Sequence, residues 1–368
     1  MVDGGALTVL RSIVESLAQY SVQYRIIFLI SRKDLICDIK TRSIRFIYFP
    51  KAKRNWVYRL YYEYYYFNVF SKNLKVNLWL SLHDTTPRVK SQKCMVYCHN
   101  PSPFLEMPIQ DVLIDPKQYL WSHLYQYLYK MNIKKNDSVI CQQNWFASEI
   151  NRKYHPRDIV IARPNMPKSI EPIAQKEYMK LVSKYSIPIN KTLIFYPSYV
   201  RYFKNHKILF ETANHLLHDL KEKNIHFIVT MDGSENKYSK KLYTLYCDLE
   251  NVTFLGTVSR KVVERIYLES HMLAFPSKLE TWGLPLSEYK KYNKPIIAAN
   301  LKYAKEVLND YKLCFLFNPD KLEDMKNAIY RAINKEKGDL IIEENNTYNT
   351  IDGWDNFTNW IINQVNNT

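Results

Sequence analysis

The hydrophobic positions of the chain follow two alternating patterns. In the first, short runs are apolar at consecutive positions, as in strands buried on both faces of a parallel sheet. These runs predict strands at residues 25–31, 44–50, 76–82, 93–99, 138–143, 159–165, 192–198, 226–233, 252–256, 271–277, 295–300 and 314–319. In the second, apolar residues recur at helical spacing, which predicts helices at residues 5–20, 56–72, 117–131, 144–154, 204–222, 235–249, 259–269, 284–292, 302–309 and 320–334.

The regular alternation of strands and helices predicts an α/β fold with parallel sheets and right-handed crossovers. The first series ends near Pro164, and a length of 368 residues favours two domains. We therefore predict two Rossmann-like, doubly wound domains, residues 1–168 and 169–346, followed by a C-terminal segment, residues 347–368. Ligands bind at the carboxyl ends of such strands, so we expect the two domains to face a cleft.

The charge of the chain favours an anionic partner, because the formal net charge is +16. Nucleic acid, anionic lipid and phosphorylated small molecules all fit, and so does a charge that only keeps the protein soluble. The tyrosine-rich stretch WVYRLYYEYYYFNVF at residues 56–70 suits a membrane headgroup surface or single-stranded nucleic acid. A buried helix with one solvent-exposed edge explains the tyrosine-rich stretch equally well.

Cysteine usage and apolar runs indicate the compartment. The six cysteines are scattered, so we expect reduced thiols rather than a disulfide framework. No apolar run reaches the roughly eighteen residues that a membrane span needs, and no signal peptide opens the chain. We therefore expect a cytoplasmic protein.

Two glycines stand before the first predicted amphipathic helix. Gly4 and Gly5 would let the backbone approach a ligand, and the helix N-terminus would favour an anion, although an ordinary turn is an equal explanation. Such a loop normally follows a central strand, but only Met1, Val2 and Asp3 precede it. We therefore expect the first sheet to lack a central strand, or the chain to be truncated.

Two histidines follow neighbouring predicted strands, His83 in SLHDTTP and His99 in YCHNPSP. Both would lie at the edge of the cleft, and both could instead be structural. Neither an HxH nor an HExxH pattern accompanies them, so we do not predict a zinc site.

Basic residues follow the first strand of the second series. Arg201 and Lys204, in YVRYFKN, lie between a strand and a helix, where a diphosphate would dock. Arg offers a bidentate fork and Lys a point charge, and a solvated basic turn is the alternative. Asp232 and Gly233, in TMDGSE, repeat the strand–glycine–helix arrangement. They are candidates for nucleotide contact, and Asp232 could equally cap the helix.

The stretch ETWGLPLSE combines two carboxylates with a glycine at the start of a helix. Gly283 permits a tight backbone, and the amides near Gly283 and Leu284 can hold phosphate oxygens. Glu288 could accept two hydrogen bonds from a ribose diol, and Glu280 could accept them from sugar hydroxyls, because carboxylates offer only acceptors. The alternative is that Glu288 only favours the helix dipole.

In their order along the chain, these motifs resemble the family 4 retaining glycosyltransferases of the GT-B type. The resemblance rests on DGG, LHDTTP with YCHNPSPF, RYFKN, DGSE, FLG and, above all, ETWGLPLSE after FPSKL. The pair LHDTTP and YCHNPSPF is similar to enzymes of bacterial O-antigen and capsule assembly. The resemblance implies that the first domain binds the acceptor and the second binds the nucleotide sugar. It also implies a C-terminal helix that packs back on the first domain through Trp354, Phe357, Trp360 and Ile361.

By the same resemblance, Arg201 and Lys204 stabilise the departing diphosphate, and His99 lies beside the transferred sugar. Glu280 binds sugar hydroxyls and Glu288 binds the ribose. The other expected nucleotide-sugar contacts are Gly4, Gly5, Asp232, Gly233, Gly283 and Leu284.

The reaction implied is transfer of a hexosyl group from a UDP- or GDP-linked sugar to a hydroxyl of a glycan or lipid-linked glycan, with retained configuration. We expect no metal and no other cofactor, because the chain has no DxD motif and offers two basic side chains instead. We also expect peripheral contact with the anionic inner face of the cytoplasmic membrane, and no nucleic-acid partner. The alternative is a catalytically impaired, basic module of the same fold that binds membrane or nucleic acid.

Overall fold

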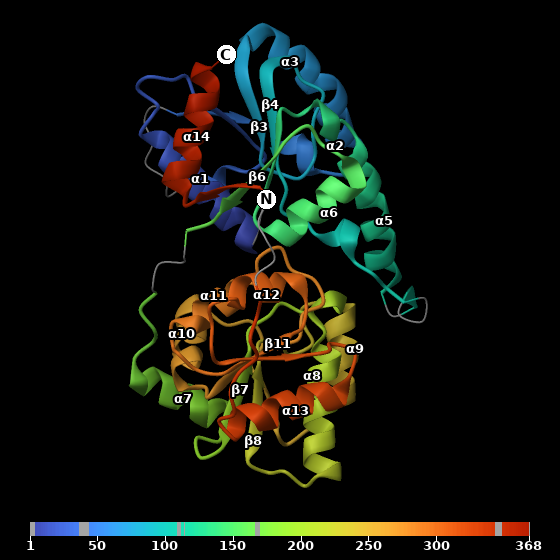
Figure 1. Cartoon of the computed structure of the whole chain (residues 1–368), viewed down its shortest axis with the longest axis vertical. Coiled ribbons are helices and arrows are strands. Elements are labelled where there is room, and N and C mark those ends of the chain that lie inside the picture. The colour runs from blue at the N-terminus through green and yellow to red at the C-terminus, as the bar shows by residue number, and fades with distance from the viewer. Residues whose placement is uncertain are drawn as a thin grey trace. The chain divides into compact units, whose positions relative to one another are not determined.

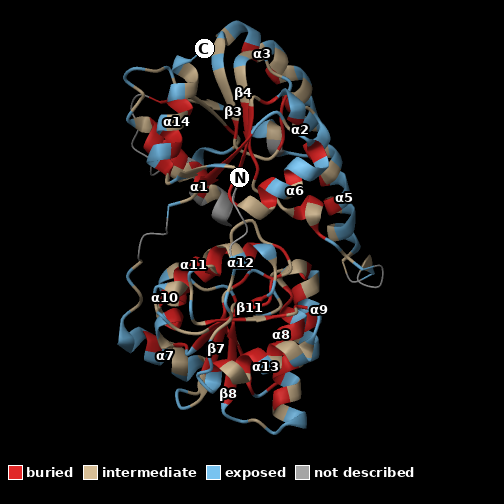
Figure 2. Ribbon diagram, viewed as in Figure 1, coloured by how far each residue is buried: buried red, intermediate tan, exposed pale blue. Residues whose placement is uncertain are grey.

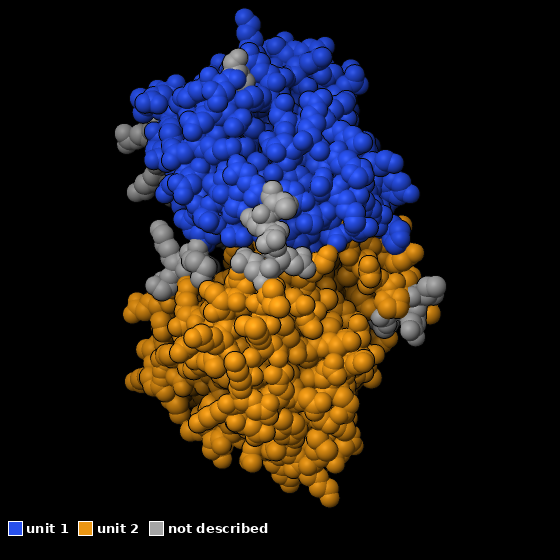
Figure 3. All heavy atoms as spheres, viewed as in Figure 1, with its two compact units in different colours: residues 1–103, 123–165, 346–368 blue, residues 104–122, 166–345 orange. Residues whose placement is uncertain are grey.

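The chain divides into two compact units (Figure 3). The computed structural model describes residues 4–36, 44–108, 112–113, 115–165, 170–342 and 348–367. Unit 1 comprises residues 1–103, 123–165 and 346–368, and unit 2 comprises residues 104–122 and 166–345. Each unit has its own parallel sheet, so each is described by itself below.

Unit 2 contains a six-stranded sheet in the order β12-β11-β10-β7-β8-β9, and every neighbouring pair is parallel. Its strands are β7 (Thr192–Tyr196), β8 (Ile225–Val229), β9 (Val252–Phe254), β10 (Met272–Phe275), β11 (Ile296–Ala299) and β12 (Cys314–Phe317). Most of their residues are buried, which explains the continuous apolar runs in the sequence. Because β7 and β10 are neighbours, the loops that follow them lie at one edge of the sheet.

Helices cover both faces of this sheet (Figure 1). Helix α13 packs on β11 and β12 and beside α8, whereas α11 packs on β10 and β11 and beside α12. The helical segments are α7 (Gln175–Tyr185), η6 (Tyr202–Lys204), α8 (His206–Asn214), the π-helical η7 (His215–Asp219), α9 (Lys237–Tyr246), α10 (Arg260–Glu269), α11 (Leu284–Lys290), α12 (Lys302–Leu308) and α13 (Leu322–Ile333). The predicted α/β class with parallel sheets is confirmed.

Unit 1 contains a five-stranded parallel sheet, ordered β13-β6-β5-β4-β3, and a separate parallel pair, β1-β2. The strands are β1 (Ile27–Ile30), β2 (Arg45–Tyr48), β3 (Val76–Ser81), β4 (Ser91–Tyr97), β5 (Ser138–Cys141), β6 (Ile159–Arg163) and β13 (Asn349–Asp352). Strand β13 was not predicted, because its residues are mostly polar and none is fully buried. It pairs with β6, so the C-terminal segment contributes to the sheet as well as forming a helix.

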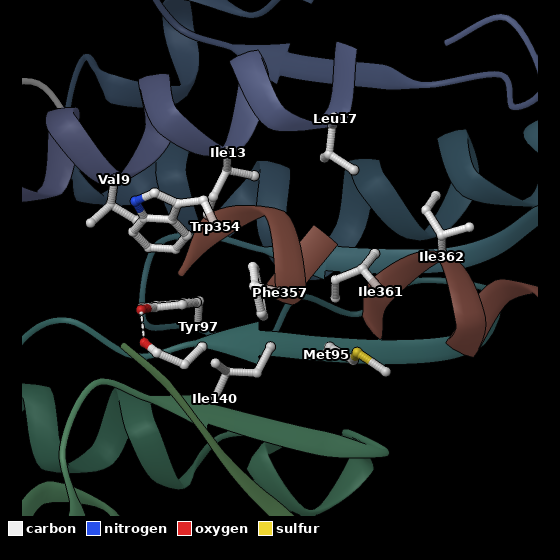
Figure 4. Close-up of a cluster of buried hydrophobic side chains, with 11 residues drawn as sticks. Val9, Ile13, Leu17, Met95, Tyr97, Ile140, Trp354, Phe357, Ile361 and Ile362 are labelled. Atoms are coloured by element: carbon white, nitrogen blue, oxygen red, sulfur yellow. Dashed lines mark hydrogen bonds between the residues drawn. The ribbon is translucent and has the colours of Figure 1, made fainter. Parts of the chain in front are cut away.

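Helix α1 (Gly4–Ala18) and helix α14 (Trp354–Asn366) pack side by side against the five-stranded sheet. The buried residues at this contact are Val9, Ile13 and Leu17 of α1, Trp354, Phe357, Ile361 and Ile362 of α14, and Met95, Tyr97, Ile140 and Ala162 of the sheet (Figure 4). Burying each large apolar side chain contributes about 1.5–3 kcal/mol, so α14 is a substantial part of this core. Helix α1 also packs against the β1-β2 pair through Leu10 and Val14, and so joins the two sheets.

The tyrosine-rich stretch forms α2 (Trp56–Tyr61), the π-helical η3 (Tyr62–Tyr66) and α3 (Phe67–Leu74). Its inner face packs around the Phe49 ring, whose centroid lies 5.5–5.7 Å from those of Tyr62, Tyr66, Phe67 and Phe70. Exposed positions recur along α2 and α3 (Figure 2). The exposed large apolar side chains of the stretch include Val57, Tyr61, Tyr65 and Val69, which lie at every fourth position. The stretch is therefore a packed helical element with an apolar outer stripe.

The remaining helical segments of the chain complete unit 1 and its connections. They are η1 (Lys33–Ile36), η2 (Pro50–Lys53), η4 (Ser102–Phe104), α5 (Pro116–Lys130), η5 (Ile133–Lys135) and α6 (Asn144–Tyr154). No helix among the described residues is long and apolar enough to cross a membrane.

Candidate functional site

The neighbouring ends of β7 and β10 bring two predicted site residues together. The Lys204 ammonium forms an ion pair with Glu280 Oε1. Lys204 ends η6, shortly after β7, and Glu280 lies in the loop after β10. The two side chains are only 20% and 12% exposed. A charge pair that is largely withdrawn from water interacts more strongly than one on an open surface.

Hydrogen bonds from the surrounding strands hold the Lys204 turn in place. The Tyr196 hydroxyl, at the end of β7, donates to the Lys204 carbonyl oxygen at 2.7 Å. Asn205 follows in a left-handed conformation, with φ of 56°, and its side-chain amide donates to the Pro319 carbonyl at 2.8 Å. The Lys204 ammonium also lies 6.0 Å from the centre of the Phe275 ring. The turn is therefore a fixed part of unit 2 rather than a solvated basic loop.

Arg201 begins the same turn but extends to the surface. Its guanidinium lies 5.0 Å from the centre of the Tyr199 ring, and the residue is exposed. Within the described part of the chain it forms no ion pair with a carboxylate. Its charge is therefore available to an anion near the end of β7.

Gly283 shapes the start of α11. Its backbone is left-handed, with φ of 78°, a conformation that other residues rarely adopt. An added Cβ would lie 3.3 Å from Leu286 Cδ1 and 3.5 Å from Phe275 Cε1. Leu284 follows as the first residue of α11. The turn therefore requires the glycine for its conformation.

Glu288 is engaged within unit 2. It is 4% exposed, its Oε1 lies 2.5 Å from Arg260 Nη2, and its Oε2 accepts a hydrogen bond from the Tyr267 hydroxyl at 3.1 Å. Arg260 was not identified from the sequence; it is the first residue of α10 and also contacts Glu264 at 2.9 Å. Its position directly after the FLGTVS turn is the only sequence signal for it. A ribose that bonds to Glu288 must share its carboxylate with Arg260 and Tyr267.

The turn after β8, which contains Gly233, is held by hydrogen bonds among its own residues. The amides of Asp232 and Gly233 donate to the Glu235 carboxylate at 2.9 Å and 3.2 Å. Asp232 Oδ1 accepts a hydrogen bond from the Ser234 amide at 3.0 Å. The proposal that Asp232 caps the helix is wrong, because the N-cap of α9 is Asn236, which lies further along the chain. Glu235 was not identified from the sequence, although it binds both amides considered for nucleotide contact.

In unit 1, His99 is held in its neutral form. Its ring stacks on Tyr97 with centroids 4.4 Å apart, and Gln142 Nε2 donates to its Nδ1 at 3.1 Å, which leaves the ring proton on Nε2. Burial lowers the pKa of His99 to about 4, although the nearby Asp84 charge opposes this shift. The ring also interacts with the backbone of Leu82. His99 is therefore a fixed, uncharged group at the end of β4.

Gly4 and Gly5 form the first turn of α1 itself rather than a loop before it. This corrects the expected helix start at residue 5. The three residues before Gly4 lie outside the described residues.

A hollow in unit 2 does not coincide with the predicted site. A hollow of about 440 Å³ adjoins η6, and its lining includes Tyr202, Lys207 and Lys278 but none of Lys204, Glu280 or Glu288. Among the residues that the structure describes, no group of three or more His, Cys, Asp or Glu side chains is arranged to hold a metal ion.

The two parallel-sheet units have the fold of GT-B glycosyltransferases. A glycosyltransferase from Rickettsia africae ESF-5 matches 100% of this chain and 91% of its own length, with a TM-score of 0.63 and 16% identity. HepE from Anabaena, solved in complex with UDP-glucose, matches 90% of this chain and 87% of its own, with a TM-score of 0.62 and 15% identity. At these identities the likeness establishes the fold.

Sequence comparison relates the second unit to a known protein family. Residues 180–348 match the family model described as Glycosyl transferases group 1. The O-antigen chain mannosyltransferase RfbU of Salmonella typhimurium is 23% identical over 254 residues, which is 67% of this chain and 62% of RfbU. The match therefore spans less than two thirds of that relative. The predicted resemblance to GT-B glycosyltransferases of bacterial polysaccharide synthesis is confirmed.

Proposed function

We propose that this protein transfers a sugar from a nucleotide-diphosphate sugar to a hydroxyl of a glycan or lipid-linked glycan, with retained anomeric configuration. The observation that carries the proposal is the Lys204–Glu280 ion pair at the neighbouring ends of β7 and β10. Both residues lie within the segment that matches the group 1 family. The similarity to an O-antigen mannosyltransferase supports a role in surface polysaccharide synthesis, either of O-antigen or of capsule.

The chemistry of the proposed reaction follows from the charges at this edge of the sheet. As the bond between the sugar and the diphosphate breaks, negative charge develops on the departing oxygen. Lys204 is fixed near the end of β7 before any ligand binds, so it stabilises this charge without further reorganisation. Arg201 adds a guanidinium that can hold two phosphate oxygens.

Glu280 and Glu288 would select the two sugar moieties of the donor. Glu280 Oε1 bonds to Lys204, and its Oε2 is an acceptor for a hydroxyl of the transferred sugar. Glu288 would bind the ribose diol together with Arg260, whose guanidinium it already contacts. The HepE complex with UDP-glucose supports a UDP-linked donor, and a GDP-linked donor is the alternative.

We further propose that the reaction needs no metal ion, because Lys204 and Arg201 supply the positive charge that a divalent cation supplies in other transferases. Turnover should persist in EDTA at the rate measured without added metal. Loss of turnover in EDTA with recovery on adding Mg²⁺ or Mn²⁺ would contradict this part of the proposal.

Unit 1 would also contact the anionic inner face of the cytoplasmic membrane. The apolar stripe of α2, η3 and α3 is exposed, and so are Leu124 and Tyr127 of α5 and Met131, which directly follows that helix. Exposed aromatic and aliphatic side chains on a protein of net charge +16 suit an anionic headgroup surface.

The test of the proposed function is a donor screen. Purified full-length protein is incubated with UDP- and GDP-linked hexoses, and release of the nucleoside diphosphate is measured with and without glycan acceptors. We expect turnover of at least one donor, and NMR of the product should show the anomeric configuration of the donor. Absence of turnover with every donor and acceptor, or an inverted product, would contradict the proposal.

A further inference from the structure

A buried carboxylate lies at the centre of a hydrogen-bond cluster in unit 1 that the proposed donor chemistry does not use. Glu63 is 4% exposed and sits in the π-helical segment η3. Its Oε1 accepts from Arg59 Nε at 2.7 Å and contacts His83 Nε2 at 3.0 Å, while its Oε2 accepts from the Thr85 hydroxyl at 2.7 Å. Segments of π-helix are uncommon and often accompany functional sites.

The partners of Glu63 keep it ionised. Burial by itself would raise its pKa, but the neighbouring His83 and Arg59 and the Thr85 hydroxyl outweigh burial and lower the pKa to about 2. A buried charge is tolerated only when it is paired and hydrogen-bonded in this way. The ionised Glu63 carboxylate therefore only accepts hydrogen bonds, and its position fixes the orientation of the groups that donate to it.

This arrangement sets the chemistry of the His83 ring. Because the Glu63 carboxylate accepts, His83 Nε2 carries a proton, and in the neutral ring Nδ1 is then a hydrogen-bond acceptor. Within the described part of the chain, Nδ1 has no hydrogen-bond partner, and the side chain is 37% exposed. His83 therefore presents an oriented ring nitrogen, Nδ1, to a ligand.

The backbone at His83 is fixed at the end of β3. Arg59 Nη2 donates to the His83 carbonyl at 3.3 Å, and Asp84 adopts a left-handed conformation with φ of 72°. Asp84 in turn accepts from the amides of His99 and Asn100 at 2.5 Å and 2.9 Å, which ties the ends of β3 and β4 together. Leu82 packs against the cores of both sheets of unit 1, so His83 lies where these sheets meet. Ligands of open parallel sheets bind at such strand ends.

We propose that His83 is a hydroxyl-binding residue of the acceptor site in unit 1, and that Glu63 is the residue that positions it. This inference rests on the proposed glycosyl transfer, because it assigns the acceptor as a neutral polyhydroxyl compound. A hydroxyl of the glycan, which can donate or accept, forms a hydrogen bond with His83 Nδ1. Because such a ligand is neutral, the site needs no free charge to bind it. This agrees with the ion pair that Arg59 and Glu63 form with each other.

Two substitutions at His83 separate ligand binding from a purely structural role. The amide of His83→Gln reaches the position of Nε2 and can keep the contact with Glu63, whereas the amide of His83→Asn lies nearer the position of Nδ1. We expect His83→Gln to raise the acceptor KM about three- to tenfold, the equivalent of one lost hydrogen bond, and to affect the donor KM less. His83→Asn should raise the acceptor KM less than His83→Gln but lower the melting temperature more. If His83→Asn, the variant with the lower melting temperature, instead raises the acceptor KM more than His83→Gln does, His83 is a structural residue and the inference is overturned.

A second measurement needs no donor and so tests the inference apart from the proposed function. In full-length protein with ¹³C-labelled histidine, the His83 signal is assigned by its loss in His83→Gln. Methyl α-D-mannopyranoside, methyl α-D-glucopyranoside and methyl α-D-galactopyranoside are then titrated in turn. We expect a saturable shift of the His83 signal with at least one glycoside, and none for the exposed His218 of unit 2. Absence of a shift with all three would overturn the inference, even if donor turnover supports the proposed function.

Discussion

Among single residues, Lys204 is the side chain on which turnover should depend most. We expect Lys204→Ala to lower kcat about 100-fold or more, because removing one preorganised group that stabilises transition-state charge typically costs that much. Steady-state kinetics with the best donor from the screen measure this effect. The melting temperature should be recorded alongside, because the substitution leaves the largely buried Glu280 without its ion-pair partner.

Lys207→Ala is the matched control for that substitution. Lys207 lies on α8 directly after the turn, is half-exposed, and contacts Glu211 at 3.5 Å, a surface pair that contributes little to stability. Its kcat should stay within about twofold of the wild type. If Lys204→Ala also retains near wild-type turnover while remaining folded, Lys204 does not stabilise the leaving group.

The same residues show what a single sequence can predict about a site. Lys204 and Glu280 were expected at one site because each follows a strand, and the carboxyl ends of parallel strands share an edge. The contacts of Glu288 with Arg260 and Tyr267 could not be predicted, because they depend on how α10 packs against α11. Glu63 was missed for a similar reason: it stands inside a tyrosine run, and only the fold brings His83 and Thr85 to it.

At the scale of secondary-structure elements, the exposed stripe of α2, η3 and α3 predicts membrane contact. We expect a variant that combines Val57→Ser, Tyr61→Ser and Tyr65→Ser to bind vesicles with anionic lipid about tenfold more weakly, because it removes the apolar area that enters the headgroup region. Co-sedimentation with vesicles of phosphatidylglycerol and phosphatidylcholine measures this binding.

A surface leucine or isoleucine elsewhere provides the control for the membrane variant. Ile189 of unit 2 is exposed and lies just before β7, so Ile189→Ser should leave vesicle binding unchanged. Equal binding of the wild type and the triple variant would refute a membrane role for the stripe. If the wild type is a dimer and the variant a monomer, with vesicle binding unaltered, the stripe instead binds a second copy of the chain.

The elements also show where periodicity fails as a guide. Residues 56–72 and 204–222 were each predicted as one continuous helix, but the first contains the π-helical segment η3. The second starts at Lys204, the last residue of the η6 turn, and contains the π-helical η7. A π-turn changes which side chains share a face without altering the apolar composition, so a count of apolar spacings does not detect it. Strand β13 was missed because its stability comes from pairing with β6 rather than from its own polar sequence.

For the molecule as a whole, buried neutral histidines should make folding sensitive to mild acid. Burial lowers the pKa of His206 to about 3, and that of His226 and His99 to about 4, from the ordinary value of 6.5. In the unfolded chain these histidines bind protons as the pH falls below 6.5, whereas in the folded chain they do not. Their contribution to stability is therefore complete above pH 6.5 and is lost as the pH falls toward 4. By pH 5 the loss is on the order of 2 kcal/mol for each histidine.

Between pH 7.5 and 5, the contribution of the histidines to stability can be measured apart from that of Glu63. Glu63, whose pKa is lowered to about 2 from 4.5, stays ionised throughout, and its contribution declines only as the pH falls below about 4.5. Calorimetry at pH 7.5, 6 and 5 should therefore show melting temperatures that fall by several degrees. His226→Gln is the test variant, because its amide can keep the 2.8 Å contact with Thr253 Oγ1 but does not titrate. The variant should lose less stability than the wild type over this range, and an equal loss in both would show that His226 is not the group responsible.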